Sequence, residues 1–152
     1  MKREIVNKRF IKIIAVFIAV FHGTPVYAWR VTEARFKTIS RGQYSHYGQS
    51  DHQQVIEINN AEDWQAFWKR HVQGVLPSPP LPEVDFTTRF VLVAMDEVRG
   101  SGGYGIEIKE IKLDPTMSDR PFEIILQLTQ PGSAAGTIAV MTRPYHIVEV
   151  EK

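Results

Sequence analysis

The 152-residue sequence contains no cysteine. This absence excludes disulfide bonds, thiolate catalysis, cysteine-ligated zinc and the lipid-bearing cysteine of a lipoprotein. The chain also lacks internal repeats and low-complexity tracts. A chain without disulfides must be held together by its core, and this one is long enough to bury a core in a single domain.

Long apolar runs are also absent, because the longest, IIAVFIAVF at residues 13–21, is far shorter than a membrane span of about 20 residues. Basic residues precede it, and VYA ends at Ala28. This order predicts a signal peptide over residues 1–28, cleaved after Ala28. An uncleaved N-terminal anchor is the alternative. We expect a protein exported to the periplasm or the extracellular space, soluble and without stable membrane insertion after cleavage.

The net charge changes when the predicted signal peptide is removed. The full chain carries +1, whereas residues 29–152 hold 13 basic and 16 acidic residues and carry −3. This mildly acidic chain lacks the basic surface that binds nucleic acid, so no nucleic-acid partner is expected.

One segment, residues 59–74, has the pattern of a helix. Asn60 is a suitable N-cap and Gly74 suits the C-terminal end. One stripe with helical period consists of Trp64, Phe67, Trp68 and His71. We expect this stripe to cover one face of a sheet, with an aromatic partner-binding face as the alternative.

Alternating or continuous apolar segments predict about seven strands. They lie near residues 36–39, 55–58, 89–98, 104–113, 121–130, 137–142 and 145–150. A break in the alternation near Glu110 predicts a β-bulge. The proline-rich segment 75–86 fits neither a helix nor a central strand. The expected fold is mainly β with one α-helix (α+β), an antiparallel β-sandwich or open barrel, in a single domain over residues 29–152.

The segment RGSGGYGIEI, residues 99–108, holds three glycines within four positions. A phosphate-binding loop would lead into a helix and carry a lysine, but this loop leads into a predicted strand. It also lacks the G-x-S-x-G pattern that would make Ser101 a nucleophile. The remaining interpretations are a hairpin turn and a turn presented to another protein, and the sequence favours neither.

Histidines and carboxylates form no known catalytic or metal-binding pattern. His46, Asp51 and His52 share a polar loop without ligand spacing, and Asp85 and Asp96 lie near strand ends. We therefore expect no catalytic residue, no metal and no cofactor, and hence a protein that is not an enzyme. An enzyme using these carboxylates or a histidine is the alternative, and it would require a concave pocket of converging ionisable groups.

Three segments resemble the PrcB C-terminal-domain family: EDWQAFWKRH, the stretch from LPEVDF to IEIKEI, and RPYHIVEVEK. The likeness is strongest over residues 84–151, where Gly102-Gly103-Tyr104 and Pro144-Tyr145 hold matching places. The family is named for a subunit of a bacterial surface protease complex. The resemblance therefore implies a domain that assists or stabilises an envelope or extracellular protease. The namesake is a lipoprotein, and this chain departs from it by lacking cysteine.

A fainter similarity links the same loops to chagasin-type inhibitors of cysteine peptidases. One of the two similar loops ends in glycine and an aromatic residue, at residues 101–104, and the other has the order arginine, proline, aromatic, at residues 143–145. The first loop lacks the threonine pair that precedes the glycine in those inhibitors, and the second has tyrosine in place of their tryptophan. Both resemblances imply a non-enzymatic protein that binds another exported protein. The first makes it a helper of a protease, and the second an inhibitor. The expected contact residues are Gly100, Ser101, Gly102, Gly103, Tyr104, Arg143, Pro144 and Tyr145.

Overall fold

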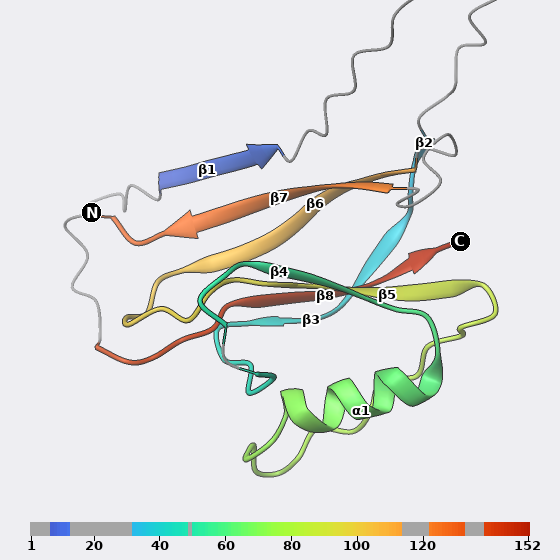
Figure 1. Ribbon diagram of the computed structural model, residues 1–152, viewed down its shortest axis with the longest axis horizontal. Coiled ribbons are helices and arrows are strands. Elements are labelled where there is room, and N and C mark those ends of the chain that lie inside the picture. Colours follow the sequence, from blue (N-terminus) through green and yellow to red (C-terminus); the bar gives the residue numbers. More distant parts are fainter. Residues whose placement is uncertain (1–6, 13–31, 49, 114–121, 133–138) are drawn as a thin grey trace, which may run out of the picture.

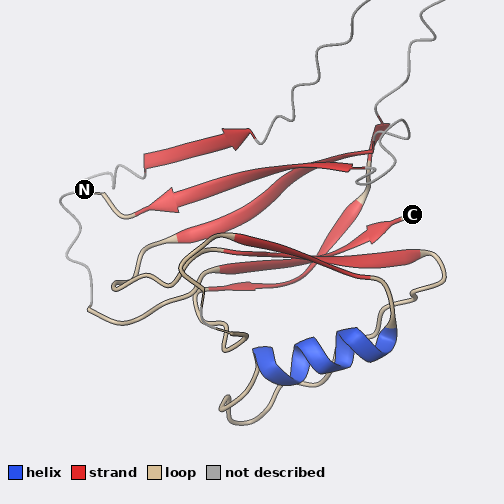
Figure 2. Ribbon diagram, in the orientation of Figure 1, coloured by secondary structure: helices blue, strands red, loops and turns tan. Residues whose placement is uncertain are grey.

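A computed structural model describes residues 7–12, 32–48, 50–113, 122–132 and 139–152. Two four-stranded sheets and one helix form three layers, with the helix against the outer face of one sheet (Figures 1 and 2). The sheets are not closed into a barrel. The expected α+β class with an antiparallel sandwich is therefore confirmed.

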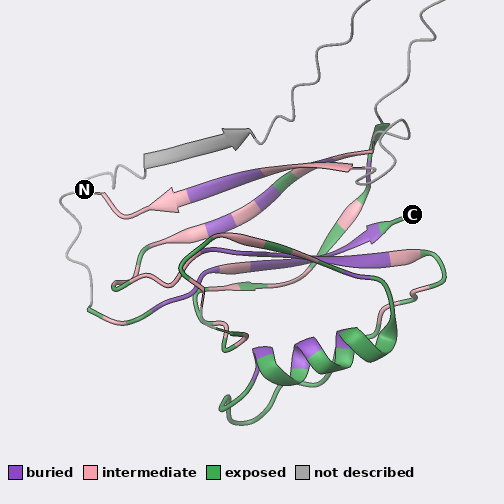
Figure 3. Cartoon of the chain, viewed as in Figure 1, coloured by how far each residue is buried: buried purple, intermediate pink, exposed green. Residues whose placement is uncertain are grey.

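Both sheets are antiparallel throughout the described pairings. In order, the first sheet contains β1 (Asn7–Lys12), β7 (Phe122–Gln130), β6 (Gly105–Leu113) and β2 (Thr32–Glu33). The second sheet contains β3 (Phe36–Gly42), β8 (Tyr145–Glu151), β5 (Arg89–Met95) and β4 (Gln54–Ile58). Strands β5 and β8 are central and almost wholly buried, as their near-continuous apolar sequences predict (Figure 3).

The space between the two sheets is filled by alternate side chains of the inner faces. They include Leu92, Ile108, Leu126 and Val148, each 2% exposed or less. In β6 the register shifts between Ile108 and Glu110, so the predicted bulge is confirmed. This bulge keeps both Ile108 and Ile111 in the core although their spacing breaks the period of two.

A second core lies between the other sheet and α1 (Ala61–His71). The helix begins after Asn60, whose Oδ1 accepts the backbone N–H of Asp63 at 2.8 Å. Its buried residues are Trp64, Phe67, Trp68 and His71, the stripe expected from the sequence. The stripe packs on the sheet face that carries Val91 and Val93, so the expectation that it covers a sheet is confirmed.

His146 links the two sheets from within the molecule. It lies on β8, where its Nδ1 accepts the backbone N–H of Ile108 at 2.9 Å and its Nε2 lies 2.8 Å from Oγ1 of Thr38. Nδ1 is thus an acceptor, so Nε2 carries the proton and donates to Thr38. Burial, with the nearby charge of Arg41, lowers the pKa of His146 to about 4. The ring is therefore neutral at pH 7.

Two expectations need correction. Residues 139–142 of the strand predicted at 137–142 form only an isolated bridge, Arg99 to Thr142. Residues 137–138 lie outside the described residues. Two of the observed strands were not expected from the sequence. One is β2, which has two residues, and the other is β1, which falls in the predicted signal peptide. The rest of that predicted peptide, with its cleavage site, lies outside the described residues.

Candidate functional site

The glycine loop, residues 99–104, and the loop before β8 meet at one end of the sandwich (Figure 1). Arg99 and Thr142 exchange two backbone hydrogen bonds, at 2.8 and 2.9 Å. The hydroxyl of Thr142 also donates to the carbonyl of Ser101 at 3.0 Å. These bonds bring together the two stretches in which the sequence placed the contact residues.

The three glycines of the loop differ in what the backbone requires of them. Gly103 has a φ of 89°, and a Cβ there would lie 2.9 Å from Cβ of Pro131, so a side chain is excluded twice. A Cβ on Gly100 would meet nothing within 4 Å, and one on Gly102 would make an ordinary contact with Gln43. Neither φ is positive. The fold therefore requires glycine at only one of these three positions.

Arg99 fixes the start of the glycine loop. Its Nε lies 3.0 Å from a carboxylate oxygen of buried Asp96, and its Nη1 lies 2.5 Å from Glu97. The guanidinium also stacks 4.7 Å from the ring centroid of Tyr104. Burial opposes the charge on Arg99, but Asp96 and Glu97 together raise its pKa. The loop is thus tied down at both ends while Gly100 and Gly103 remain exposed.

Arg143 is buried, with 4% of its surface exposed. Its guanidinium donates to the backbone carbonyls of Tyr47, Gly48 and Asp96 and to the side-chain oxygen of Gln54. Burial lowers its pKa. Arg143 therefore holds the β3–β4 loop against the glycine loop, and its own surface is not presented to a partner.

Pro144 and Tyr145 are also part of the interior support. Pro144 is fully buried, and the hydroxyl of Tyr145 lies 3.1 Å from Oγ of Ser40. The Tyr145 ring meets His71 of α1 edge-on, with 4.4 Å between ring centroids. Of the eight expected contact residues, those in the glycine loop are accessible, whereas Arg143 and Pro144 are not.

A serine–histidine pair exists near this end, but it does not involve Ser101. Oγ of Ser45 lies 2.9 Å from Nδ1 of His71. Burial and the neighbouring charge of His46 lower the pKa of His71 to about 4. An imidazole with so low a pKa is a weak general base, and the pair joins the β3–β4 loop to the end of α1.

The expected carboxylates have structural partners. Hydrogen bonds from Thr87 and Thr88 lower the pKa of Asp85, and Asp96 pairs with Arg99. His52 pairs with Asp51 on the exposed surface. No cluster of three potential metal ligands occurs among the residues that the structure describes.

Two exposed apolar side chains belong to residues next to the bonds that join these loops, and the sequence did not single them out. Met141 is 68% exposed and immediately precedes the bridged Thr142. Tyr44 is 56% exposed and follows Gln43, whose carbonyl accepts the N–H of Arg143 at 2.8 Å. Only the long-range bonds of the loops place them here, so no local sequence signal marks them.

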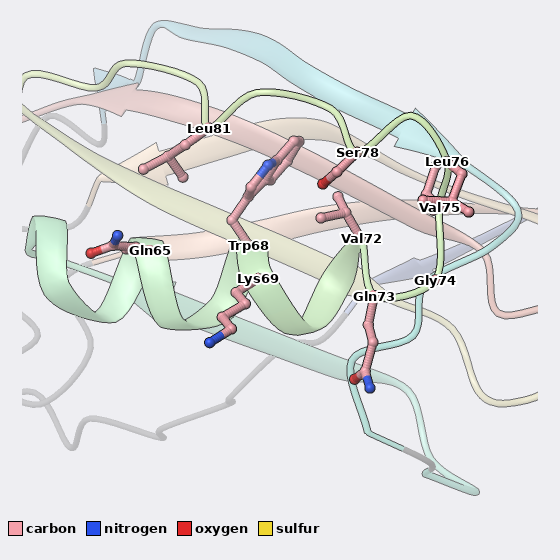
Figure 4. A pocket seen from close by; sticks show the side chains of 10 residues that line it. All are labelled: Gln65, Trp68, Lys69, Val72, Gln73, Gly74, Val75, Leu76, Ser78 and Leu81. Atoms are coloured by element: carbon pink, nitrogen blue, oxygen red, sulfur yellow. The ribbon is translucent and has the colours of Figure 1, made fainter.

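A groove of about 430 Å³ lies between the C-terminal part of α1 and the proline-rich connection to β5 (Figure 4). Trp68 lines it, and the indole N–H of Trp68 donates to the carbonyl of Pro79 at 3.4 Å. Leu76 and Leu81 are exposed at its rim. The lining is mainly apolar and carries Lys69 as its only ionisable side chain. It therefore lacks the converging ionisable groups that the enzyme alternative requires.

A family model described as PrcB C-terminal matches residues 90–151. The resemblance to this family is thus confirmed over β5, β6, β7 and β8, a span that includes the glycine loop and the loop before β8. The similarity to chagasin-type inhibitors is not shown. No curated protein and no solved structure matches the chain. Within the described ranges, no helix is long and apolar enough to cross a membrane.

Proposed function

We propose that the protein is an exported, non-enzymatic binding domain that contacts another envelope or secreted protein through its glycine loop. We further propose that this partner is a protease, which the domain assists or stabilises. The family match supports a role beside a protease, because the family is named for a protease-complex subunit. The match covers the elements that carry the loop.

The accessibility of the loop backbone is the observation that carries the proposal. The fold has room for a side chain at Gly100 and at Gly102, so it does not require glycine there. Because glycine has no side chain, the backbone N–H and C=O groups at these positions are open to close approach by a partner. The loop is also held at both ends, since Arg99 at its start pairs with Asp96 and bridges to Thr142, and the same guanidinium stacks on Tyr104 at its end. A pre-organised loop loses less conformational entropy on binding. Met141 supplies an exposed apolar side chain beside it.

A stoichiometric protease inhibitor is the second candidate. The meeting of the two loops at one end favours it, since an inhibitor of that kind would insert both into a cleft. The burial of Arg143 and Pro144 weighs against it, because these two expected contact residues are not available for insertion into a cleft. The helper function is therefore the one that we propose.

The proposal predicts that a side chain added at Gly100 abolishes capture of the partner without unfolding the domain. The variant is Gly100→Glu, which meets open space. Asn59→Glu is the matched control, an exposed position between β4 and α1 at the opposite end of the sandwich (Figure 1). Both tagged variants and the wild type are used to capture proteins from the native envelope and secreted fractions.

We expect wild type and Asn59→Glu to capture the same protease and Gly100→Glu to lose it by at least tenfold. Equal capture by all three chains would place the contact elsewhere and overturn the role of the loop. Protease activity with increasing amounts of the domain then separates the two candidates, because an inhibitor abolishes activity at one equivalent and a helper preserves it on heating.

N-terminal sequencing of the exported chain tests the predicted cleavage.

A further inference from the structure

The outer edge of β7 is occupied by a strand from the N-terminal part of the chain. Residues 7–12 pair with it in antiparallel fashion, from Asn7 opposite Gln130 to Lys12 opposite Ile125 (Figure 1). The other edge of β7 is hydrogen-bonded to β6. The outer edge of residues 125–130 thus carries a regular antiparallel ladder, with no shift in its register.

β7 would become an edge strand if β1 were removed. A strand edge presents a row of N–H and C=O groups, and proteins usually protect such edges with lysine, proline, bulges or short length. β7 spans nine residues and contains no lysine or proline, and Glu123 is its only charged residue. Its register with β1 is unbroken. It therefore lacks every one of these protections.

The other edge strands of the described sheets are protected. β2 has only two residues and β4 only five. β3 carries Lys37 and Arg41 and has a register shift between Thr38 and Ser40. The contrast indicates that the unprotected outer edge of β7, which β1 covers, is specific to this strand among the described sheets.

The occupant seen on this edge defines the chemistry that it accepts. Its sequence, NKRFIK, is extended, basic and without proline or glycine. Arg9 and Ile11 lie opposite Leu128 and Leu126 of the core. The net charge of −3 over residues 29–152 also favours a basic strand.

We propose that the β7 edge is a strand-accepting site. Residues 7–12 fill it in the unprocessed chain, and an extended basic segment of the partner protein fills it once they are removed. The accepted strand pairs antiparallel with residues 125–130, as in β-augmentation. The inference rests on the proposed function in one respect: β1 is removed only if the chain is exported and its signal peptide is cleaved. Gln130 precedes Pro131, whose Cβ would lie 2.9 Å from a Cβ placed on Gly103, so an added strand would continue the surface of the glycine loop.

Amide hydrogen exchange on the full chain tests this site without any need for export. The variant Phe10→Pro removes a backbone donor from the middle of β1, and Phe10→Ala, which keeps the backbone N–H, is the matched control. We expect at least tenfold faster exchange in Phe10→Pro only, at those amides of residues 125–130 that point to β1 and not at those that point to β6. Amides of β5 and β8, which lie in the other sheet, report that each variant is folded.

A peptide with the sequence of residues 7–12, added at millimolar concentration to Phe10→Pro, should restore the protection. The same peptide with proline in place of phenylalanine should not. Unchanged exchange in Phe10→Pro would show that β1 does not occupy the edge. Faster exchange without rescue by the peptide would show that the edge does not accept a separate strand. Either outcome overturns the inference, and neither bears on capture of a partner by the glycine loop.

Discussion

Individual residues of the glycine loop have different physical duties. Gly103 serves the fold, because its positive φ and its contact with Pro131 exclude any side chain. Gly100 serves no such need. Arg143, which the sequence placed on the contact surface, is a buried donor to the backbone of a neighbouring loop. The residues expected at the contact thus divide into positions that support the fold, such as Gly103 and Arg143, and accessible positions, such as Gly100.

This division predicts a stability difference between two glycine substitutions. Gly103→Ala should lower the free energy of unfolding by about 1–3 kcal/mol, because a left-handed backbone strains alanine and its Cβ meets Pro131. Gly100→Ala should change it by less than about 0.5 kcal/mol, as expected at an unconstrained surface position. Urea unfolding measures both. Equal effects would contradict the assignment of these two positions.

At the scale of elements, α1 combines local and long-range stabilisation. Its N-cap and its first acidic turn are properties of the local sequence. Its buried stripe is held by the sheet on one side and by the proline-rich connection on the other. The indole N–H groups of Trp64 and Trp68 donate to carbonyls in that connection, at 2.9 and 3.4 Å. The prolines thus leave their carbonyls free to accept, while their rings keep the segment extended.

The N-cap gives the second stability prediction. Asn60→Ala removes the acceptor for the N–H of Asp63 and should lower the free energy of unfolding by about 1 kcal/mol. Asn59→Ala, the neighbouring exposed asparagine, bonds only to the carboxylate of Glu57 and should have a much smaller effect. Thermal unfolding followed by circular dichroism compares them. A loss in Asn59→Ala as large as that in Asn60→Ala would argue against the cap.

For the whole molecule, two cores share one sheet. β5 and β8 contribute alternate side chains to both, one set facing β6 and β7 and the other facing α1. His146 and His71 are the buried titratable rings of this assembly, one between the sheets and one under the helix. Because both are neutral when folded, the stability of the molecule depends on pH.

Both histidines have a pKa of about 4 in the folded chain, below the ordinary 6.5. Between pH 6.5 and 4 the unfolded chain therefore binds more protons than the folded chain. As far as these two rings are concerned, the free energy of unfolding should be highest above pH 6.5 and should fall as the pH drops towards 4. Urea midpoints measured at pH 7.5, 6, 5 and 4 test this. A flat profile would contradict it.

The variant His146→Leu should reduce this dependence. At pH 7 it leaves the N–H of Ile108 buried without an acceptor, which should cost about 1–3 kcal/mol. Below pH 6.5 its unfolding free energy should fall less steeply than that of the wild type, because one of the two titrating rings is gone. A parallel loss at all pH values would show that His146 does not titrate as described.

The sequence by itself determined the helix, its capping residue and buried stripe, six of the strands and the bulge in β6. These features are expressed in local periodicity and in residues that favour one backbone conformation. The tertiary structure alone decided which strands pair, that residues 139–142 form only a bridge, and that Arg143 and Pro144 are buried while Gly100 is exposed. The occupied edge of β7 is also of this kind. These features depend on contacts between residues far apart in the chain, and such contacts leave no periodic trace in either partner's segment.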